Sequence, residues 1–247
     1  MTPDPLSPAG LAVGYDPEVR AGAHNGRDEA VTTPSEPPAP SPEPASPDGH
    51  AHRHPSSKLH AAVFAASMVF GRGKAATTVA DLARLTPADR VVDIGCGPGT
   101  AVRVASRRCE WATGVDPDPT MLRFGRWLAS LLRRRNMSLV EGPAEAIPLP
   151  DANATVVWSL SAVHHWSDRS AGLAEAKRVL APGGRIFLVE RLSSPGARGQ
   201  QKYGMIDAQL DALESDATRA GFIAVRRDMH TAGRGSLAVV RGSKATG

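Results

Sequence analysis

Residues Val91–Thr100 read VVDIGCGPGT, and this stretch decides the fold. Val91–Ile94 is a short apolar run rich in β-branched residues, which predicts a buried parallel strand. Three glycines follow at every second position, and a helical pattern then runs from Thr100 to Arg108. In α/β folds a strand, a glycine turn and a helix in this order bring bare backbone up to a nucleotide-like ligand. The stretch therefore predicts a nucleoside site at the carboxyl end of the first strand.

Two aspartates beside this turn indicate which nucleoside binds. Asp116 ends the next apolar stretch, Trp111–Val115, where its carboxylate can accept both ribose hydroxyls at roughly 1.5–3 kcal/mol each. Asp93 lies two residues before the first glycine, so it would repel a pyrophosphate and attract a cationic amino group. The dinucleotide fingerprint also requires a small residue where Thr100 stands. The pattern favours S-adenosylmethionine (SAM) over a nicotinamide dinucleotide.

With these residues in place, the chain resembles the class I SAM-dependent methyltransferases, in particular the small-molecule branch that contains quinone-biosynthesis enzymes. The resemblance is close over residues 85–190. It implies an α/β fold: a Rossmann-like seven-stranded, mostly parallel sheet of order 3-2-1-4-5-7-6 with helices on both faces. It also implies that Gly95, Gly97 and Gly99 face the methionine part of SAM, that Asp93 orients its amino group and that Asp116 binds the ribose.

The adenine end departs from the family pattern. Family members follow the third strand with Gly-Asp-Ala, whereas this chain has Gly142-Pro143-Ala144-Glu145. Pro143 has no side-chain acceptor, so adenine recognition falls to the Ala144 backbone, to Glu145 or to water. Met121 can cap the adenine face, or it can simply pack in the core. The predicted cofactor-binding residues are Asp93, Gly95, Gly97, Gly99, Asp116, Pro117, Met121, Ala144, Glu145 and Ser159.

The candidate catalytic residue comes from Ser159–Trp166 (SLSAVHHW), which follows the fourth predicted strand. The resemblance places this segment near the reacting centre, where His164 and His165 correspond to a common Leu-His-His. His164 can remove a proton from a substrate hydroxyl, phenol or activated carbon. The alternative is a histidine that caps the next helix or is buried. Alignment of acceptor and methyl group is the main catalytic task, and it can supply up to about 7–11 kcal/mol.

Composition divides the chain. Residues 1–55 hold 12 of the 21 prolines and carry a net charge of −5, which predicts a disordered acidic Pro-rich tail. Residues 56–247 carry a net charge of +9 and are long enough for one domain, with N-terminal helices over 56–88 and the core over 89–247.

Apolar periodicity predicts the remaining elements. Helices are expected at 58–70, 76–85, 100–108, 119–132, 170–180 and 206–220, and strands at 90–94, 111–115, 138–141, 154–160, 185–190, 222–227 and 236–241. The helix over 119–132 is predicted to face inward through Met121, Leu122, Trp127, Leu128 and Leu131.

The chain thus predicts an enzyme that methylates a small, apolar metabolite by in-line displacement, with S-adenosylhomocysteine as the second product. An RNA methyltransferase is an alternative that the basic body and Arg133–Arg135 permit, but the Asn/Asp-Pro-Pro-aromatic motif is missing after the fourth strand. A noncatalytic SAM-binding protein is another alternative, and a nicotinamide oxidoreductase ranks last. The acceptor is expected to contact the N-terminal helices and the loop Leu192–Gly204, including Tyr203.

Other features of the sequence limit which partners and which cellular location are expected. Two cysteines without metal-ligand spacing predict no metal and no disulfide framework. No signal peptide is visible, and the longest apolar stretch, Ala61–Phe70, is too short to cross a bilayer, so a cytoplasmic protein is expected. Nucleic acid is a disfavoured partner, and a homodimer is left open.

Overall fold

The computed structural model describes residues 73–193, 204–232 and 235–247. In chain order the elements are α2 (Gly73–Leu82), β1 (Arg90–Ile94), α3 (Thr100–Ala105), β2 (Trp111–Asp116), α4 (Pro119–Leu131), β3 (Met137–Glu141), β4 (Ala154–Leu160), the 3-10 turn η1 (Val163–His165), α5 (Arg169–Val179), β5 (Leu180–Arg191), α6 (Asp207–Arg219), β6 (Ile223–Ala232) and β7 (Gly235–Ser243). The predicted tail, the predicted helix over 58–70 and most of the loop containing Tyr203 lie outside the described residues.

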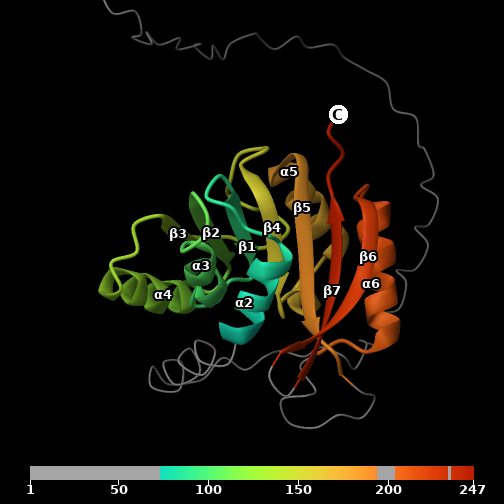
Figure 1. The fold of residues 1–247 in the computed structure, drawn as a ribbon, viewed down its shortest axis with the longest axis horizontal. Coiled ribbons are helices and arrows are strands. Elements are labelled where there is room, and N and C mark those ends of the chain that lie inside the picture. The colour runs from blue at the N-terminus through green and yellow to red at the C-terminus, as the bar shows by residue number, and fades with distance from the viewer. Residues whose placement is uncertain (1–72, 194–203, 233–234) are drawn as a thin grey trace, which may run out of the picture. The chain divides into compact units, whose positions relative to one another are not determined.

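The seven strands form one sheet of order β3-β2-β1-β4-β5-β7-β6, which confirms the predicted Rossmann-like fold (Figure 1). Strands β1 to β5 are parallel, and β7 runs antiparallel to both β5 and β6. The strand order reverses between β1 and β4, where Asp93 is in register with Trp158. Ligands of open α/β sheets bind at the carboxyl ends of strands beside such a reversal.

Apolar side chains alternate between the two faces of the sheet and build a core on each. On β4, Val156 and Trp158 join a cluster that also contains buried residues of α2, α3 and α4. Val157, between them, joins the opposite cluster together with buried residues of α5 and α6. Figure 1 shows α4 beside β3 and α6 beside β6, at the two edges of the sheet. Because both faces are covered, the central strands are mostly apolar.

The predicted inward face of α4 is partly wrong. Met121 and Leu122 are buried as predicted, but Trp127 and Leu131 are 60% and 63% exposed, and Leu128 is half-buried. Gly125 and Ala129 take the inner positions. A Cβ atom on Gly125 would lie 2.6 Å from Leu139 Cδ1 and 2.9 Å from the Pro98 carbonyl oxygen. The helix therefore approaches the sheet through its small residues, and this close approach rotates the larger ones outward.

Several element boundaries also differ from the prediction. The helix that follows the glycine turn ends at Ala105 rather than at Arg108. Strand β5 begins at Leu180 rather than at Arg185, and β6 continues to Ala232 rather than ending at Arg227. No helix among the described residues is long and apolar enough to cross a membrane.

Asp89 ties together the amino ends of three strands. Its buried carboxylate precedes β1 and accepts hydrogen bonds from Thr155 Oγ1 of β4 at 2.7 Å and from Arg185 Nη2 of β5 at 2.6 Å. The backbone N–H and the hydroxyl of Thr86 donate to its other oxygen. Burial raises the pKa of Asp89, but the bonds from Thr155 and Thr86 and the Arg185 charge outweigh burial and hold the pKa below its ordinary value.

Candidate active site

The glycine turn between β1 and α3 depends on left-handed backbone. Gly95, Gly97 and Gly99 have φ angles of 74°, 54° and 72°, a region that only glycine enters without steric cost. The N–H groups of Gly95 and Cys96 both donate to the Val115 carbonyl oxygen, at 2.8 and 3.1 Å. The turn is therefore fixed against the end of β2, and its backbone can approach a ligand closely.

Asp116 closes the same turn from the end of β2. Its Oδ2 accepts the Gly97 N–H at 2.7 Å, and its Oδ1 accepts the Asp118 N–H at 2.9 Å. The side chain is nine-tenths buried. A carboxylate can accept several hydrogen bonds at once. Its place at the end of β2, bonded to the glycine turn, is consistent with the predicted ribose role, which stays a prediction.

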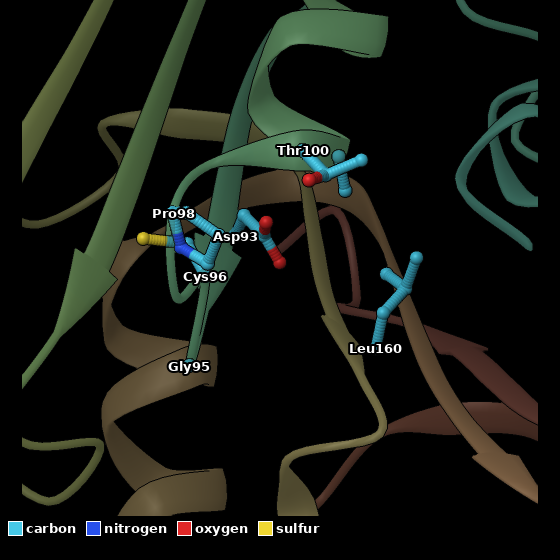
Figure 2. A pocket seen from close by; sticks show the side chains of 7 residues that line it. Asp93, Gly95, Cys96, Pro98, Thr100 and Leu160 are labelled. Carbon is cyan, nitrogen blue, oxygen red and sulfur yellow. The ribbon is translucent and has the colours of Figure 1, made fainter. Parts of the chain in front are cut away.

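Asp93 lies in β1, two residues before the first glycine of the turn. Figure 2 shows its carboxylate in a small pocket that is lined by Asp93, Gly95, Cys96, Pro98, Thr100, Ala101 and Leu160. The residue is 2% exposed. The thiol of Cys96 is also buried, and burial, followed by the negative charges of Asp93 and Asp116, raises its pKa well above the ordinary value. Cys96 therefore contributes packing to the pocket rather than a nucleophilic thiolate.

Arg103 is a site residue that the sequence reasoning missed. It lies on α3 and is almost fully buried, and its Nη1 donates to the Pro98 carbonyl oxygen at 2.6 Å while its Nη2 donates to Thr100 Oγ1 at 3.1 Å. Burial, with a smaller effect from Arg107, lowers its pKa. The guanidinium thus bonds to the glycine turn at Pro98 and to the start of α3 at Thr100. The available signal was a single charge in the otherwise weakly polar helix TAVRVA.

The predicted adenine residues have different surroundings. Met121 and Ala144 are buried, and Pro117 is exposed. Glu145 accepts hydrogen bonds from the Asp168 N–H at 3.0 Å and from the Ser167 hydroxyl at 3.1 Å. Burial raises the pKa of Glu145, but these bonds outweigh it and lower the pKa. Glu145 is thus anchored to the start of α5, and the part that each of these residues plays toward adenine stays a prediction.

Two buried polar groups lie along β4 and in the segment that follows it. Ser159 is fully buried, and its Oγ has no hydrogen-bond partner among the described residues. His164, in η1, bonds through Nδ1 to Glu190 Oε2 at 2.9 Å, and the exposed His165 packs against it with ring centroids 3.9 Å apart. The sequence reasoning missed Glu190. The signal that could have found it is a lone acid at the end of the apolar run Ile186–Glu190.

The segment carrying His164 contacts the glycine turn directly. A Cβ atom on Gly95 would lie 2.4 Å from the Cβ of Ala162, two residues before His164. The Ser161 N–H donates to the Val189 carbonyl oxygen at 2.7 Å, which ties the same segment to β5. The structure therefore brings the glycine turn, Asp116 and the histidine segment together at the carboxyl ends of the central parallel strands.

Comparisons with known proteins agree with this geometry. A family model described as a methyltransferase domain matches residues 92–188. Residues 92–188 are thus a methyltransferase domain of the class I SAM-dependent type. It is 32% identical over 164 residues to a 27-O-demethylrifamycin SV methyltransferase of Amycolatopsis mediterranei, covering 66% of this chain and 52% of that protein. It is also 34% identical over 125 residues to a malonyl-[acyl-carrier protein] O-methyltransferase of Serratia marcescens, covering 51% of this chain and 46% of that protein.

Solved structures show the same fold. The structure of a SAM-dependent methyltransferase from Aquifex aeolicus aligns with a TM-score of 0.61 and 16% identity over 76% of this chain and 98% of that one. The chain spans about half the length of the curated relatives it matches. The family's methyl donor is SAM. Three observations fit SAM to this site: the left-handed glycine backbone, the buried Asp93, and the Asp116 carboxylate bonded across the turn.

Proposed function

We propose that this methyltransferase-family chain transfers the methyl group of SAM to a small, apolar metabolite. The observation that carries the proposal is the Asp116 carboxylate bonded across the glycine turn, within the segment that the family model matches. The relatives named above act on small molecules or on a carrier-bound acyl group according to their names. Another relative, 29% identical over 106 residues, is a demethylmenaquinone methyltransferase of Tropheryma whipplei, and that name supports an apolar acceptor.

The site divides into a cofactor part and an acceptor part. Bound SAM supplies a methyl group that its cationic sulfur has already activated. The glycine turn and Asp93 hold the methionine end, and Asp116 binds the ribose. Met121, Ala144, Glu145, Pro117 and Ser159 complete the cofactor site in the roles predicted above. His164 accepts the proton that the acceptor loses. Positioning the acceptor in line with the methyl group can lower the barrier by up to about 7–11 kcal/mol.

Calorimetry with SAM tests the cofactor part. Asp116→Asn removes the negative charge that faces the ribose and leaves one acceptor oxygen, and losing one charge-assisted hydrogen bond of about 1.5–3 kcal/mol weakens binding by about tenfold to a hundredfold. Asp118→Asn is the matched control. Asp118 caps α4 by accepting from the Thr120 N–H at 2.7 Å, and asparagine caps a helix equally well, so SAM affinity should stay near wild type. Equal affinity of Asp116→Asn and wild type would refute the ribose assignment.

Transfer of tritium from methyl-labelled SAM tests the reaction. The full chain is incubated with a panel of small phenols, quinols, amines and carboxylic acids and, separately, with total RNA. Label in a small molecule supports the proposal. Label in RNA alone would replace it with the RNA methyltransferase alternative. SAM binding with no label in either would favour a noncatalytic SAM-binding protein.

A further inference from the structure

The outer side of α4 carries large apolar side chains that the core does not use. Trp127 and Leu131 lie about one helical turn apart and are 60% and 63% exposed, and Leu132 is 47% exposed. The Trp127 ring packs against the half-buried Phe124, with ring centroids 5.7 Å apart. Figure 1 shows α4 at the edge of the sheet, beside β3. Adjacent exposed apolar side chains with a polar rim are typical of an interaction surface.

Arginines surround these apolar side chains. Residues 119–140 hold five arginines and no aspartate or glutamate. Arg123, Arg133 and Arg135 are exposed, and none of them forms an ion pair with an acid in the part of the chain that the structure describes. We call these three arginines, together with Trp127, Leu131 and Leu132, the α4 surface. It offers apolar groups and positive charge side by side, and no acid in this stretch balances the charge.

The end of α4 holds the arginine run in place. Arg133 has a φ angle of 50°, in the left-handed region where glycine commonly ends a helix. Its N–H donates to the Ser130 carbonyl oxygen at 3.0 Å, and the side-chain nitrogen of Asn136 donates to the Ser106 and Cys109 carbonyl oxygens at 2.8 and 3.2 Å. Glycine would avoid the steric cost of this angle, and the attraction of a cation to the helix dipole is typically smaller than that cost. Stability alone therefore does not account for an arginine at residue 133.

The surface of an anionic lipid bilayer matches every part of the α4 surface. Tryptophan favours the level of the lipid headgroups, because its ring has both an apolar body and a polar N–H. Leucine side chains enter the boundary between headgroups and acyl chains, as they do in interfacial helices. Arginines beside them are attracted to the negative headgroups. One ligand thus satisfies both the apolar and the charged side chains.

Other occupants match only part of this surface. In a two-fold contact between copies of the chain the same patch meets itself, so the arginines of one copy would face those of the other. RNA would attract the arginines and could stack on Trp127, but it offers no apolar partner to Leu131 and Leu132. The bilayer is therefore the occupant that the observations favour.

We propose that the α4 surface is a membrane-docking site that binds the surface of an anionic lipid bilayer. Its tryptophan and two leucines enter the interface, and its three arginines contact the lipid phosphates. Such attachment is reversible, because it buries a few side chains rather than a membrane-spanning helix. The inference goes beyond the proposed function and does not depend on it.

Sedimentation with lipid vesicles tests the docking site on the full chain. Vesicles of equal parts phosphatidylglycerol and phosphatidylcholine are compared with vesicles of phosphatidylcholine alone. At about 0.1 M salt we expect at least about tenfold tighter binding to the anionic vesicles. At about 1 M salt most of this preference should disappear, because the screening length falls to about 3 Å.

Two multiple variants separate the charged part of the surface from the apolar part. Arg123→Gln, Arg133→Gly and Arg135→Gln together remove three charges, and at about fivefold for each charge the binding should weaken by about a hundredfold. Glycine suits the backbone angle at residue 133, so this variant should fold. Trp127→Ser with Leu131→Ser should weaken binding by about tenfold or more and should also reduce the binding that remains at high salt.

A matched control comes from the opposite edge of the sheet. Arg226 and Met229 are exposed on β6, so Arg226→Gln with Met229→Ser also replaces one arginine and one large apolar side chain at the surface. This variant should bind anionic vesicles within twofold of wild type. Circular dichroism of each variant shows whether it is folded, and the comparisons of lipid and salt need only wild-type protein.

Several results would overturn the proposal. Wild-type protein that does not sediment with anionic vesicles, or that binds both kinds of vesicle equally, would refute it. So would folded α4 variants that bind as tightly as wild type, or a β6 control that loses as much binding as they do. Retention on immobilised RNA that only the arginine variant loses, with no binding to vesicles, would make this surface a nucleic-acid site instead.

Discussion

Gly95→Ala tests whether the glycine turn and the histidine segment are held together by steric contact. The new methyl group would meet Ala162 Cβ at 2.4 Å, and the φ angle of 74° disfavours any residue with a Cβ atom. The left-handed conformation costs alanine roughly 1–2 kcal/mol. Overpacking in a tight site costs roughly 1–3 kcal/mol. We therefore expect the free energy of unfolding to fall by about 2–5 kcal/mol.

A second substitution separates these two costs. Ala162→Gly removes the methyl group that the new side chain would meet, while the backbone angle at residue 95 stays the same. On its own this change should cost roughly 0.5–1 kcal/mol, from the added freedom of the unfolded chain. In the double variant the steric part disappears, so the two changes should show a favourable coupling of about 1–3 kcal/mol.

Urea unfolding of the full chain measures the four free energies, and a constant m value shows that they are comparable. Gly73→Ala is the control, because no atom lies within 4 Å of its new Cβ, and surface changes of this kind stay within about 0.5 kcal/mol. A Gly95→Ala variant as stable as wild type would refute the reasoning about the turn. A double variant whose losses simply add would show that Ala162 is not what excludes the side chain.

Two further predictions concern stability and thiol chemistry. Asp89→Asn should lower the free energy of unfolding by about 1–3 kcal/mol at pH 7, because it weakens the hydrogen bonds that the buried carboxylate accepts from Thr155, Thr86 and the partly exposed Arg185. Since the folded state lowers the pKa of Asp89, its contribution is complete above the ordinary carboxyl pKa and is lost as pH falls through the lower folded value. Thermal unfolding of both proteins should therefore converge in strong acid, and a constant difference down to pH 2 would contradict this. Burial raises the pKa of the Cys96 thiol well above its usual range and that of Cys109 to about 11, so neither should react with a disulfide reagent at pH 8 until denaturant is added. Rapid reaction in native buffer would show that the pocket opens.

The backbone of the glycine turn was predictable because local sequence determines it. Gly95, Gly97 and Gly99 are needed for their backbone angles, and Asp116 bonds to the turn that those angles create. This information lies within a short stretch of chain and does not depend on how the rest of the sheet packs. The strand order came from resemblance, because periodicity indicates that strands exist but not which ones pair.

The parts that were missed depend on contacts between distant segments. Glu190 is 26 residues from His164, and periodicity in one strand cannot show that the next loop folds back onto it. The prediction of the inward face of α4 was partly wrong for a related reason. Apolar size predicted that Trp127 would be buried, but the close approach of Gly125 to Leu139 sets the rotation of the helix. Packing against a neighbour decided the outcome, as it often does for a helix with apolar residues on several faces.

The glycine turn and the histidine segment are built on different strands, and one contact between them sets their relative position. The cofactor turn is built on β1 and β2, whereas the histidine segment is built on β4 and anchored to β5 through Glu190 and Val189. These units meet where Gly95 faces Ala162, a contact with no room for another methyl group. Because an in-line reaction is sensitive to the separation between nucleophile and methyl donor, this contact sets the geometry that both parts share. A substitution at Ala162 should therefore affect turnover more than SAM affinity, even though alanine carries no reactive group.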